Sequence, residues 1–232
     1  MCHLYDRNGE KMKKCIIITS YIDLPKESSF SLSNYIISRV NLLLNSSCSP
    51  FIICADGGYA NLKDTGIVPD LIIGDFDSYS KELPEDIPIV KLPVEKDDTD
   101  TGMCIRYALN HGMNDITIIG GIGGRLDHTI ANIQLMAGAC ENGAAIKMLS
   151  PCNEAYIVKN DSLTVARKEG FSLSVFSLTE HSYGVSLSGL YYPLDNTVLT
   201  SHFPLGVSNS FTDDEAVVTV KDGMLLVICS GL

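Results

Sequence analysis

Two carboxylates, Asp75 and Asp77, stand one residue apart directly after a short apolar run at residues 71–73. The run is bounded by Pro69 and Gly74 and is too short for a helix, so it predicts a buried parallel strand. In extended backbone, residues i and i+2 project to the same side, so both carboxylates can converge on one point. Like charges this close repel unless a cation lies between them, and a hard divalent ion such as Mg²⁺ is the natural occupant. The pair therefore predicts a metal site.

Three further polar clusters follow predicted strands at 51–55, 89–92 and 116–120. Their members are Asp56 and Gly57 after the first, Asp97, Asp98 and Asp100 after the second, and Gly121, Gly123, Gly124, Arg125, Asp127 and His128 after the third. In open α/β sheets, ligands bind outside the carboxyl ends of the strands. We therefore expect the clusters that follow the four strands to lie together at one edge of the sheet.

Each cluster also has a purely structural interpretation. Asp56 could serve the turn that it forms with Gly57. The acidic residues at 97–100 could complement the dipole of a helix N-terminus, with Thr99 or Asp98 as its cap. His128 could be a packed or capping histidine rather than a nucleotide contact.

The glycine run at 120–124 matches neither common phosphate-binding fingerprint. Leu126 stands where a dinucleotide fingerprint requires a third glycine, and no Gly-Lys-Ser/Thr occurs in the chain. Backbone amides beside Arg125 at a helix start can still cradle an anion. An acidic metal cluster and an anion cradle together favour phosphoryl or pyrophosphoryl transfer from Mg·ATP, which depends on positioning and charge neutralisation.

The elements that must position these groups alternate along the first 150 residues. Short apolar runs at 15–21, 51–55, 71–74, 89–92, 116–120 and 146–149 are separated by helix candidates at 32–44, 59–64, 100–110 and 127–141. This pattern predicts an α/β domain over residues 1–150, with a mainly parallel, Rossmann-like, three-layer arrangement.

Residues 151–232 carry only strand-like segments. They lie at 154–159, 162–167, 171–178, 185–190, 215–220 and 224–229, and Lys221-Asp222-Gly223 predicts a hairpin between the last two. We therefore expect an all-β sandwich domain here.

Composition limits the classes of partner. Asp+Glu number 28 against 17 Lys+Arg, a net charge of -11, which argues against nucleic-acid or membrane binding because no basic stripe is available. The eight cysteines form no C-x-x-C pair and several lie in apolar runs, which favours reduced thiols in the cytoplasm. No run reaches membrane-spanning length, and no signal-peptide core is found.

Four motifs in order carry a resemblance to a known family. They are Ala55-Asp56-Gly57-Gly58 with Asn61, the segment 69–78 (PDLIIGDFDS), Lys96-Asp97-x-Thr99-Asp100, and Gly120-Gly121-x-Gly123-Gly124-Arg125-Leu126-Asp127-His128. The chain resembles thiamine pyrophosphokinases across most of residues 15–150. Residues 189–194 and 207–209 resemble the family's thiamine-binding β domain more weakly.

The resemblance implies conversion of thiamine and ATP to thiamine diphosphate and AMP with Mg²⁺, in a homodimer whose active sites lie between subunits. Carried over by position, it implies catalytic metal ligands at Asp75, Asp77, Asp97 and Asp100; ATP-site residues at Asp56, Gly57, Asn61, Gly124, Arg125, Asp127 and His128; and thiamine contacts at Ser208 and Asn209. Two features depart from the family. The first strand ends in Ser20-Tyr21-Ile22-Asp23 rather than in a turn of small residues, and the chain has no Trp to stack on thiamine.

Two rival functions are weighed against this one. A phosphatase with an aspartyl nucleophile also uses D-x-D after a strand, through Asp75 with Asp77 as the acid, but it leaves the clusters at 96–100 and 124–128 unexplained. A regulatory module that binds thiamine or a nucleotide would be expected to have lost carboxylates, and all of them are present.

Overall fold

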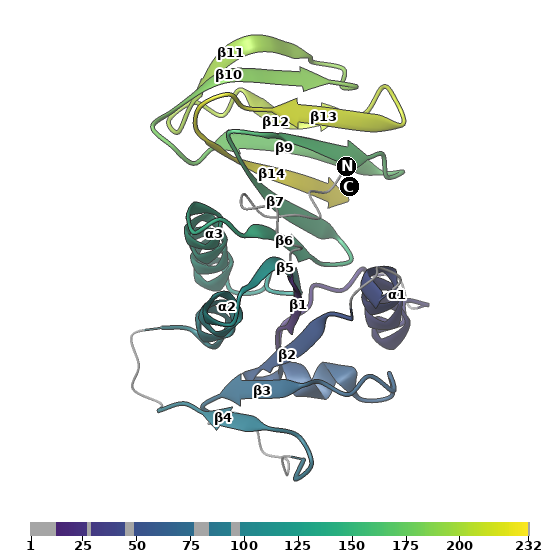
Figure 1. Cartoon of the computed structure of the whole chain (residues 1–232). Helices are drawn as coiled ribbons and strands as arrows, with labels where there is room; N and C mark the ends of the chain where they lie inside the picture. Colours follow the sequence, from purple (N-terminus) through teal and green to yellow (C-terminus); the bar gives the residue numbers. More distant parts are fainter. Residues whose placement is uncertain (1–12, 27–28, 45–48, 77–83, 94–97, 232) are drawn as a thin grey trace. The chain divides into compact units, whose positions relative to one another are not determined.

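The structure is a computed structural model that describes residues 13–26, 29–44, 49–76, 84–93 and 98–231. Within it the chain divides into two compact units, residues 3–151 and residues 152–232 (Figure 1).

The first unit contains a parallel sheet, as the sequence predicts. Its strands are β1 (Lys13–Ile18), β2 (Phe51–Ala55), β3 (Leu71–Gly74), β4 (Ile89–Lys91), β5 (Met113–Ile119) and β6 (Ala145–Leu149). They lie in the order β6-β5-β1-β2-β3-β4, and every neighbouring pair is parallel. The chain proceeds from β1 toward β4 and then returns to the other side of β1 with β5. The order of strands therefore reverses between β1 and β5, where a crevice is expected at the carboxyl edge.

Helices lie on both sides of this sheet (Figure 1). They are α1 (Leu32–Leu44), the 3₁₀ helix η1 (Asp56–Leu62), α2 (Asp100–Asn110) and α3 (Leu126–Glu141). Figure 1 places α2 and α3 on one face and α1 and η1 on the other. The central strands are buried from both sides, which explains why β1, β2 and β3 consist almost entirely of apolar residues. The helix expected at 59–64 is present, but as the 3₁₀ helix η1, which starts at Asp56 and ends at Leu62.

Local sequence signals set the ends of the helices. The Ser31 hydroxyl accepts a hydrogen bond from the Asn34 amide before α1, and the Thr99 hydroxyl accepts one from the Gly102 amide at the start of α2. Gly112 follows α2 and Gly143 follows α3, both in the left-handed region with φ of 71° and 87°.

The second unit consists of two antiparallel sheets. Its strands are β7 (Asn153–Lys159), β8 (Ser162–Ala166), β9 (Phe171–Ser177), β10 (His181–Ser188), β11 (Leu194–Thr200), β12 (Gly206–Ser210), β13 (Glu215–Thr219) and β14 (Met224–Gly231). Four of them lie in the order β12-β9-β14-β7 and the other four in the order β11-β10-β13-β8. Apolar residues of both sheets form one buried cluster, including Val175 and Val227 from one and Leu187 and Val218 from the other.

Two features of this unit differ from the sequence prediction. Strands β11 and β12 were not predicted, because polar and turn-forming residues interrupt their apolar pattern. The hairpin predicted at residues 221–223 is also wrong, since β13 pairs with β8 and β10 whereas β14 pairs with β7 and β9. The turn carries the chain from one sheet to the other, and Asn160 Oδ1 holds it by accepting the Gly223 amide at 2.8 Å.

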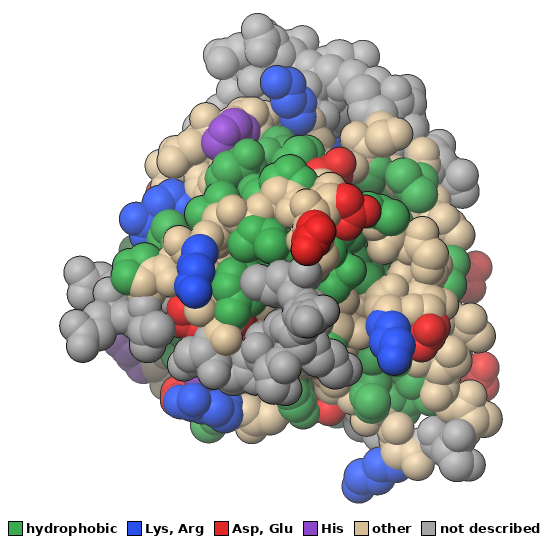
Figure 2. Space-filling model, turned by 90° about the horizontal axis from the view of Figure 1, so that it is seen from below, with side chains coloured by type: hydrophobic (Ala, Val, Ile, Leu, Met, Phe, Trp, Pro, Cys, Tyr) green, Lys and Arg blue, Asp and Glu red, His purple; other side chains and the backbone are tan. Residues whose placement is uncertain are grey.

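The edge strand β4 is the most exposed strand of the first unit, with all three of its residues at the surface. Figure 2 views the molecule from this side, where apolar side chains gather in the middle and lysine and arginine side chains lie apart from one another around them. None of the helices in the described ranges is long and apolar enough to cross a membrane.

Candidate active site

The Asp56 side chain joins the end of β2 to the backbone that follows β3. Asp56 follows β2 with a φ of 45°, a strained conformation for a residue with a side chain. Its Oδ1 accepts the backbone amide of Phe76 at 3.2 Å, so it spans the gap to the segment after β3. A Cβ atom on Gly74 would lie 3.0 Å from the same Oδ1, which shows how closely the end of β3 approaches Asp56. Asp75 follows Gly74 directly. Hard carboxylate oxygens from neighbouring strands are the donor set that Mg²⁺ prefers.

The other expected metal ligands are only partly covered by the structure. Asp100 is the first residue of α2, in its first turn. Asp77 and Asp97 lie outside the described residues. Across the described ranges, no group of three or more His, Cys, Asp and Glu side chains is arranged to hold a metal ion.

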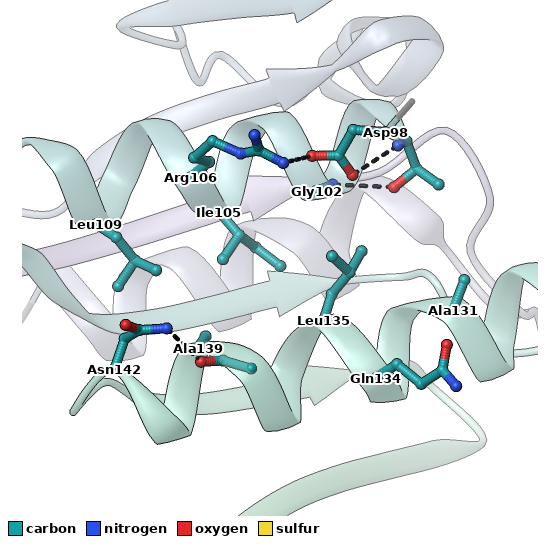
Figure 3. Close-up of a pocket in the computed structure, with 12 residues that line it drawn as sticks. Asp98, Gly102, Ile105, Arg106, Leu109, Ala131, Gln134, Leu135, Ala139 and Asn142 are labelled. Atoms are coloured by element: carbon teal, nitrogen blue, oxygen red, sulfur yellow. Dashed lines mark hydrogen bonds and ion pairs between the residues drawn. The ribbon is translucent and has the colours of Figure 1, made fainter. Parts of the chain in front are cut away.

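Asp98 has a structural role. Its Oδ1 accepts the amide of Thr99 at 2.8 Å, and its Oδ2 forms an ion pair with Arg106 (Figure 3). Gly102 leaves room for this carboxylate, because a Cβ there would collide with it. The alternative interpretation of the acidic segment, that part of it caps a helix, is therefore confirmed for Thr99, which is the N-cap of α2. Asp98 is not the cap and instead binds the Thr99 amide and Arg106.

A groove of about 720 Å³ lies between α2 and α3, with the Asp98–Arg106 ion pair at one end. Figure 3 shows side chains of both helices lining it, among them Ile105 and Leu109 from α2 and Leu135 from α3. The groove contains none of the residues expected at the metal or the nucleotide. Asp98 and Thr99, which line one end of it, are the sequence neighbours of the expected ligands Asp97 and Asp100.

The glycine-rich segment forms a tight loop between β5 and α3. Gly120, Gly121, Gly123 and Gly124 all have positive φ, between 63° and 93°. The Asn132 side chain donates to the Gly121 carbonyl at 2.9 Å. The Gly123 amide donates to the Thr129 hydroxyl at 3.1 Å. Side chains of α3 thus hold the loop, and the positive φ at these four positions explains why each of them is glycine.

Arg125 and Asp127 form an exposed pair at the start of α3. The Arg125 guanidinium donates to both carboxylate oxygens of Asp127, at 3.2 and 2.6 Å. This hydrogen bonding lowers the pKa of Asp127, and it raises the pKa of Arg125. Asp127 also accepts the His128 amide, and the His128 side chain is exposed. All three residues stand at the surface beside the glycine loop, where a bound nucleotide could reach them.

Asn61 is tied to the loop after β1. Its side-chain amide donates to the carbonyls of Thr19 at 2.9 Å and of Ser20 at 3.1 Å. Gly57, also in η1, lies against the same loop, since a Cβ there would be 3.4 Å from the Ser20 Cβ. Asn61 was expected at the ATP site, and in the structure its amide positions the backbone at the centre of the sheet edge.

In the second unit, Ser208 and Asn209 lie on β12. The buried side chain of Asn209 accepts the Tyr192 amide at 2.9 Å and donates to the Tyr192 carbonyl at 2.7 Å. Ser208 is exposed, with a φ of 55° and its amide donating to Ser174 Oγ. Asn209 therefore fixes the backbone of Tyr192. Tyr192 is 66% exposed, and its ring stands edge-on to the ring of Tyr191.

Three positioning residues were not predicted from the sequence: Thr19, Thr129 and Asn132. The Thr19 hydroxyl donates to the carbonyls of Tyr21 and Ile119, so it joins the loops after β1 and β5. Thr129 and Asn132 lie three positions apart in α3. That spacing places both on the side facing the glycine loop and could have indicated their role.

Comparison with known proteins agrees with these features. The catalytic-domain model of thiamin pyrophosphokinase matches residues 42–148, and the vitamin B1 binding-domain model of the same enzyme matches residues 161–225. The chain is 28% identical over 184 residues to thiamine pyrophosphokinase of Bacillus subtilis, covering 77% of this chain and 86% of the relative. It is 26% identical over 204 residues to thiamine pyrophosphokinase 1 of Oryza sativa subsp. japonica, covering 75% of this chain and 76% of the relative.

Solved structures share the fold. The crystal structure of thiamine pyrophosphokinase from Bacillus subtilis superposes with a TM-score of 0.77 at 24% identity, covering 95% of this chain and 100% of that one. The yeast thiamin pyrophosphokinase structure gives a TM-score of 0.69 at 17% identity, covering 96% of this chain and 87% of that one. The two domain models together span well over half of the sequence. The chain belongs to the thiamine pyrophosphokinase family.

Proposed function

We propose that this chain transfers the diphosphoryl group of ATP to the hydroxyl of thiamine, giving thiamine diphosphate and AMP. This is the known activity of its family. The observation that carries the proposal is the contact between Asp56 and the end of β3, which puts a second carboxylate next to Asp75 at the edge where α/β proteins bind ligands.

The chain's own residues bind and orient the substrates. Mg²⁺ would be held by Asp75, Asp77, Asp97 and Asp100, with Asp56 supporting the cluster, and it would neutralise charge on the transferred phosphates. The thiamine hydroxyl oxygen forms a bond to the β-phosphorus of ATP while the bond from that phosphorus to the α–β bridging oxygen breaks, and AMP leaves with that oxygen. The hydroxyl proton passes to an aspartate of the cluster. Arg125 is suited to hold the phosphate chain, since its guanidinium lies exposed at the start of α3.

Thiamine is assigned to the C-terminal unit, at Ser208 and Asn209. The support is indirect: Asn209 fixes the backbone of Tyr192, and Tyr191 and Tyr192 offer exposed aromatic rings in a chain without Trp. The thiazolium ring of thiamine is cationic, and cations bind favourably to the faces of aromatic rings.

The finer description of the enzyme belongs to the same proposal. We assign residues 1–150 to a Rossmann-like, three-layer catalytic domain and residues 151–232 to a β-sandwich that binds thiamine. The parallel order of strands supports the first assignment, and the buried cluster shared by two antiparallel sheets supports the second. A cytoplasmic location is favoured because the buried Cys15, Cys54 and Cys229 are free thiols.

We also infer a homodimer whose active sites lie between subunits. Large apolar side chains are exposed on the C-terminal unit, among them Tyr191, Tyr192 and Phe203, each about two-thirds exposed. Mixing Asp75→Asn with a variant impaired in the C-terminal unit should restore about a quarter of wild-type turnover, because half the dimers are then mixed and each has one intact site. No recovery after subunit exchange would contradict shared sites.

The direct test is to incubate the protein with thiamine, ATP and MgCl₂ and to quantify AMP and thiamine diphosphate together. Equal amounts of both products are expected. Release of inorganic phosphate with a trapped phosphoryl-enzyme would instead favour the aspartyl phosphatase. Binding of thiamine or ATP in calorimetry without formation of AMP would favour a regulatory module.

A further inference from the structure

Tyr21 lies at the point of the sheet edge where the order of strands reverses. It is in the loop after β1, and its carbonyl accepts the amide of Gly121 in the loop after β5 at 2.8 Å. Thr19 joins the same two loops by donating to the carbonyls of Tyr21 and Ile119. The crevice expected between β1 and β5 is therefore bounded by Tyr21 on one side and by the glycine loop on the other.

The ring of Tyr21 covers the glycine loop. A Cβ atom on Gly124 would lie 2.8 to 3.1 Å from three atoms of the ring, and one on Gly123 would lie 3.4 Å from it. The residue nevertheless remains 45% exposed. The Tyr21 ring thus packs one part of its surface on the backbone of Gly123 and Gly124, the residues directly before Arg125. The rest of the side chain is open to solvent.

We propose that the exposed ring of Tyr21 stacks on the adenine base of ATP and is a determinant of nucleotide affinity in this enzyme. The inference rests on the proposed function, because it assumes that ATP binds at this edge. Asp75 follows β3, two strands away from β1, which corresponds to about 10 Å across the sheet. A nucleoside triphosphate whose phosphates lie near Asp75 can span that distance and place its base at the β1 loop.

The structure also explains how the ring is held in place. Asn61 fixes the backbone before Tyr21 by donating to the carbonyls of Thr19 and Ser20. The Gly121 amide fixes the carbonyl of Tyr21 itself. The glycine at position 124 provides the space for the ring. A base that stacks on a ring fixed in this way loses little affinity to reordering of the loop.

Steady-state kinetics with both substrates tests the assignment. Stacking of one base on an aromatic side chain contributes enough that Tyr21→Ala should raise the KM for ATP about tenfold or more. The KM for thiamine should change less than twofold, and Tyr21→Phe should behave like the wild type because the ring is retained. An unchanged KM for ATP in Tyr21→Ala, or an equal rise for thiamine, would overturn the proposal.

Gly124→Ala offers a second route to the same change, because the added methyl group displaces the ring. Gly66→Ala is its matched control: Gly66 has a φ of 71°, close to the 63° of Gly124, but a Cβ there meets nothing within 4 Å. Gly124→Ala should raise the KM for ATP, whereas Gly66→Ala should not. Equal effects from both would assign the change to backbone strain and would contradict a role for the ring.

A binding measurement separates this inference from the proposed function. The chain has no Trp, so Tyr21→Trp introduces a single fluorescent reporter at the proposed contact. ATP should quench its fluorescence, and thiamine alone should not. Val68→Trp is the control, because Val68 is 68% exposed and precedes β3, at the opposite edge of the sheet. Absence of quenching by ATP would refute the stacking, even if the wild type forms AMP. Quenching without any AMP from the wild type would support it and reject the proposed reaction.

Discussion

Gly74, the last residue of β3, packs so closely on Asp56 that a Cβ atom on the glycine would lie 2.7 Å from the Asp56 Cα. Only a residue without a side chain fits there, so the ends of β2 and β3 are in direct contact. We predict that Gly74→Ala lowers turnover at least tenfold, because the methyl group must push Asp56 away from Asp75. Kinetics at saturating ATP and thiamine measures this effect.

Gly138→Ala is the control for that substitution. Gly138 lies within α3, has no positive φ, and a Cβ there meets nothing within 4 Å. Replacing glycine by alanine in a helix raises the free energy of unfolding by about 0.5–1 kcal/mol. Turnover should remain that of the wild type. If Gly74→Ala were as active as Gly138→Ala, close packing of Asp56 would have no part in catalysis.

Asn209→Ala tests the link between β12 and Tyr192. The substitution removes both hydrogen bonds to the Tyr192 backbone and leaves buried polar groups without partners, which costs about 1–3 kcal/mol per group. We expect a lower free energy of unfolding in urea and a KM for thiamine that rises more than the KM for ATP.

The matched change is Asn142→Ala, which removes a single exposed hydrogen bond to the Gly138 carbonyl. It should alter neither KM. A rise of both KM values by the same factor in Asn209→Ala would argue against thiamine binding near Tyr192.

The buried thiols predict how stability depends on alkaline pH. Burial raises the pKa of Cys54 from 9.0 to about 12, and burial with the nearby charge of Asp70 raises that of Cys15 to about 12 as well. Below pH 9 these thiols are protonated in both the folded and the unfolded chain. Between about pH 9 and pH 12 only the unfolded chain loses the protons, so the free energy of unfolding falls with rising pH.

Each such thiol contributes a slope of up to about 1.4 kcal/mol per pH unit in that range. Urea unfolding of the wild type and of Cys54→Ala at pH 8.0, 9.5 and 10.5 measures the contribution of one thiol. The variant should lose less stability between pH 8.0 and pH 10.5 than the wild type does. Parallel curves would contradict a buried, protonated Cys54.

Much of the first unit follows from the sequence because its signals are local. Buried parallel strands appear as short apolar runs, and caps such as Thr99 and Ser31 mark the starts of helices. The placement of polar clusters after strands predicts the site at one edge of the sheet. The 3₁₀ geometry of η1 could not be read in this way, because it depends on the contact of Asp56 with the β3 end.

The second unit was harder to predict because its strand pairing is not local. The turn at 221–223 has the composition of a hairpin, yet its flanking strands belong to different sheets. The roles of Asn61 and Asn209 were also beyond the sequence. Their types are compatible with ligand binding, but their amides are directed at backbone groups that are distant along the chain.

The central claim is that carboxylates from separate strand ends hold a divalent ion that binds the phosphates of ATP. Turnover of Asp75→Asn and Asp97→Asn, measured as AMP and thiamine diphosphate formed with MgCl₂ present, tests it most directly, with circular dichroism to verify the fold. We predict that both folded variants lose at least 99% of wild-type turnover, about 2.7 kcal/mol or more in the activation barrier. Near wild-type rates in both would contradict the claim.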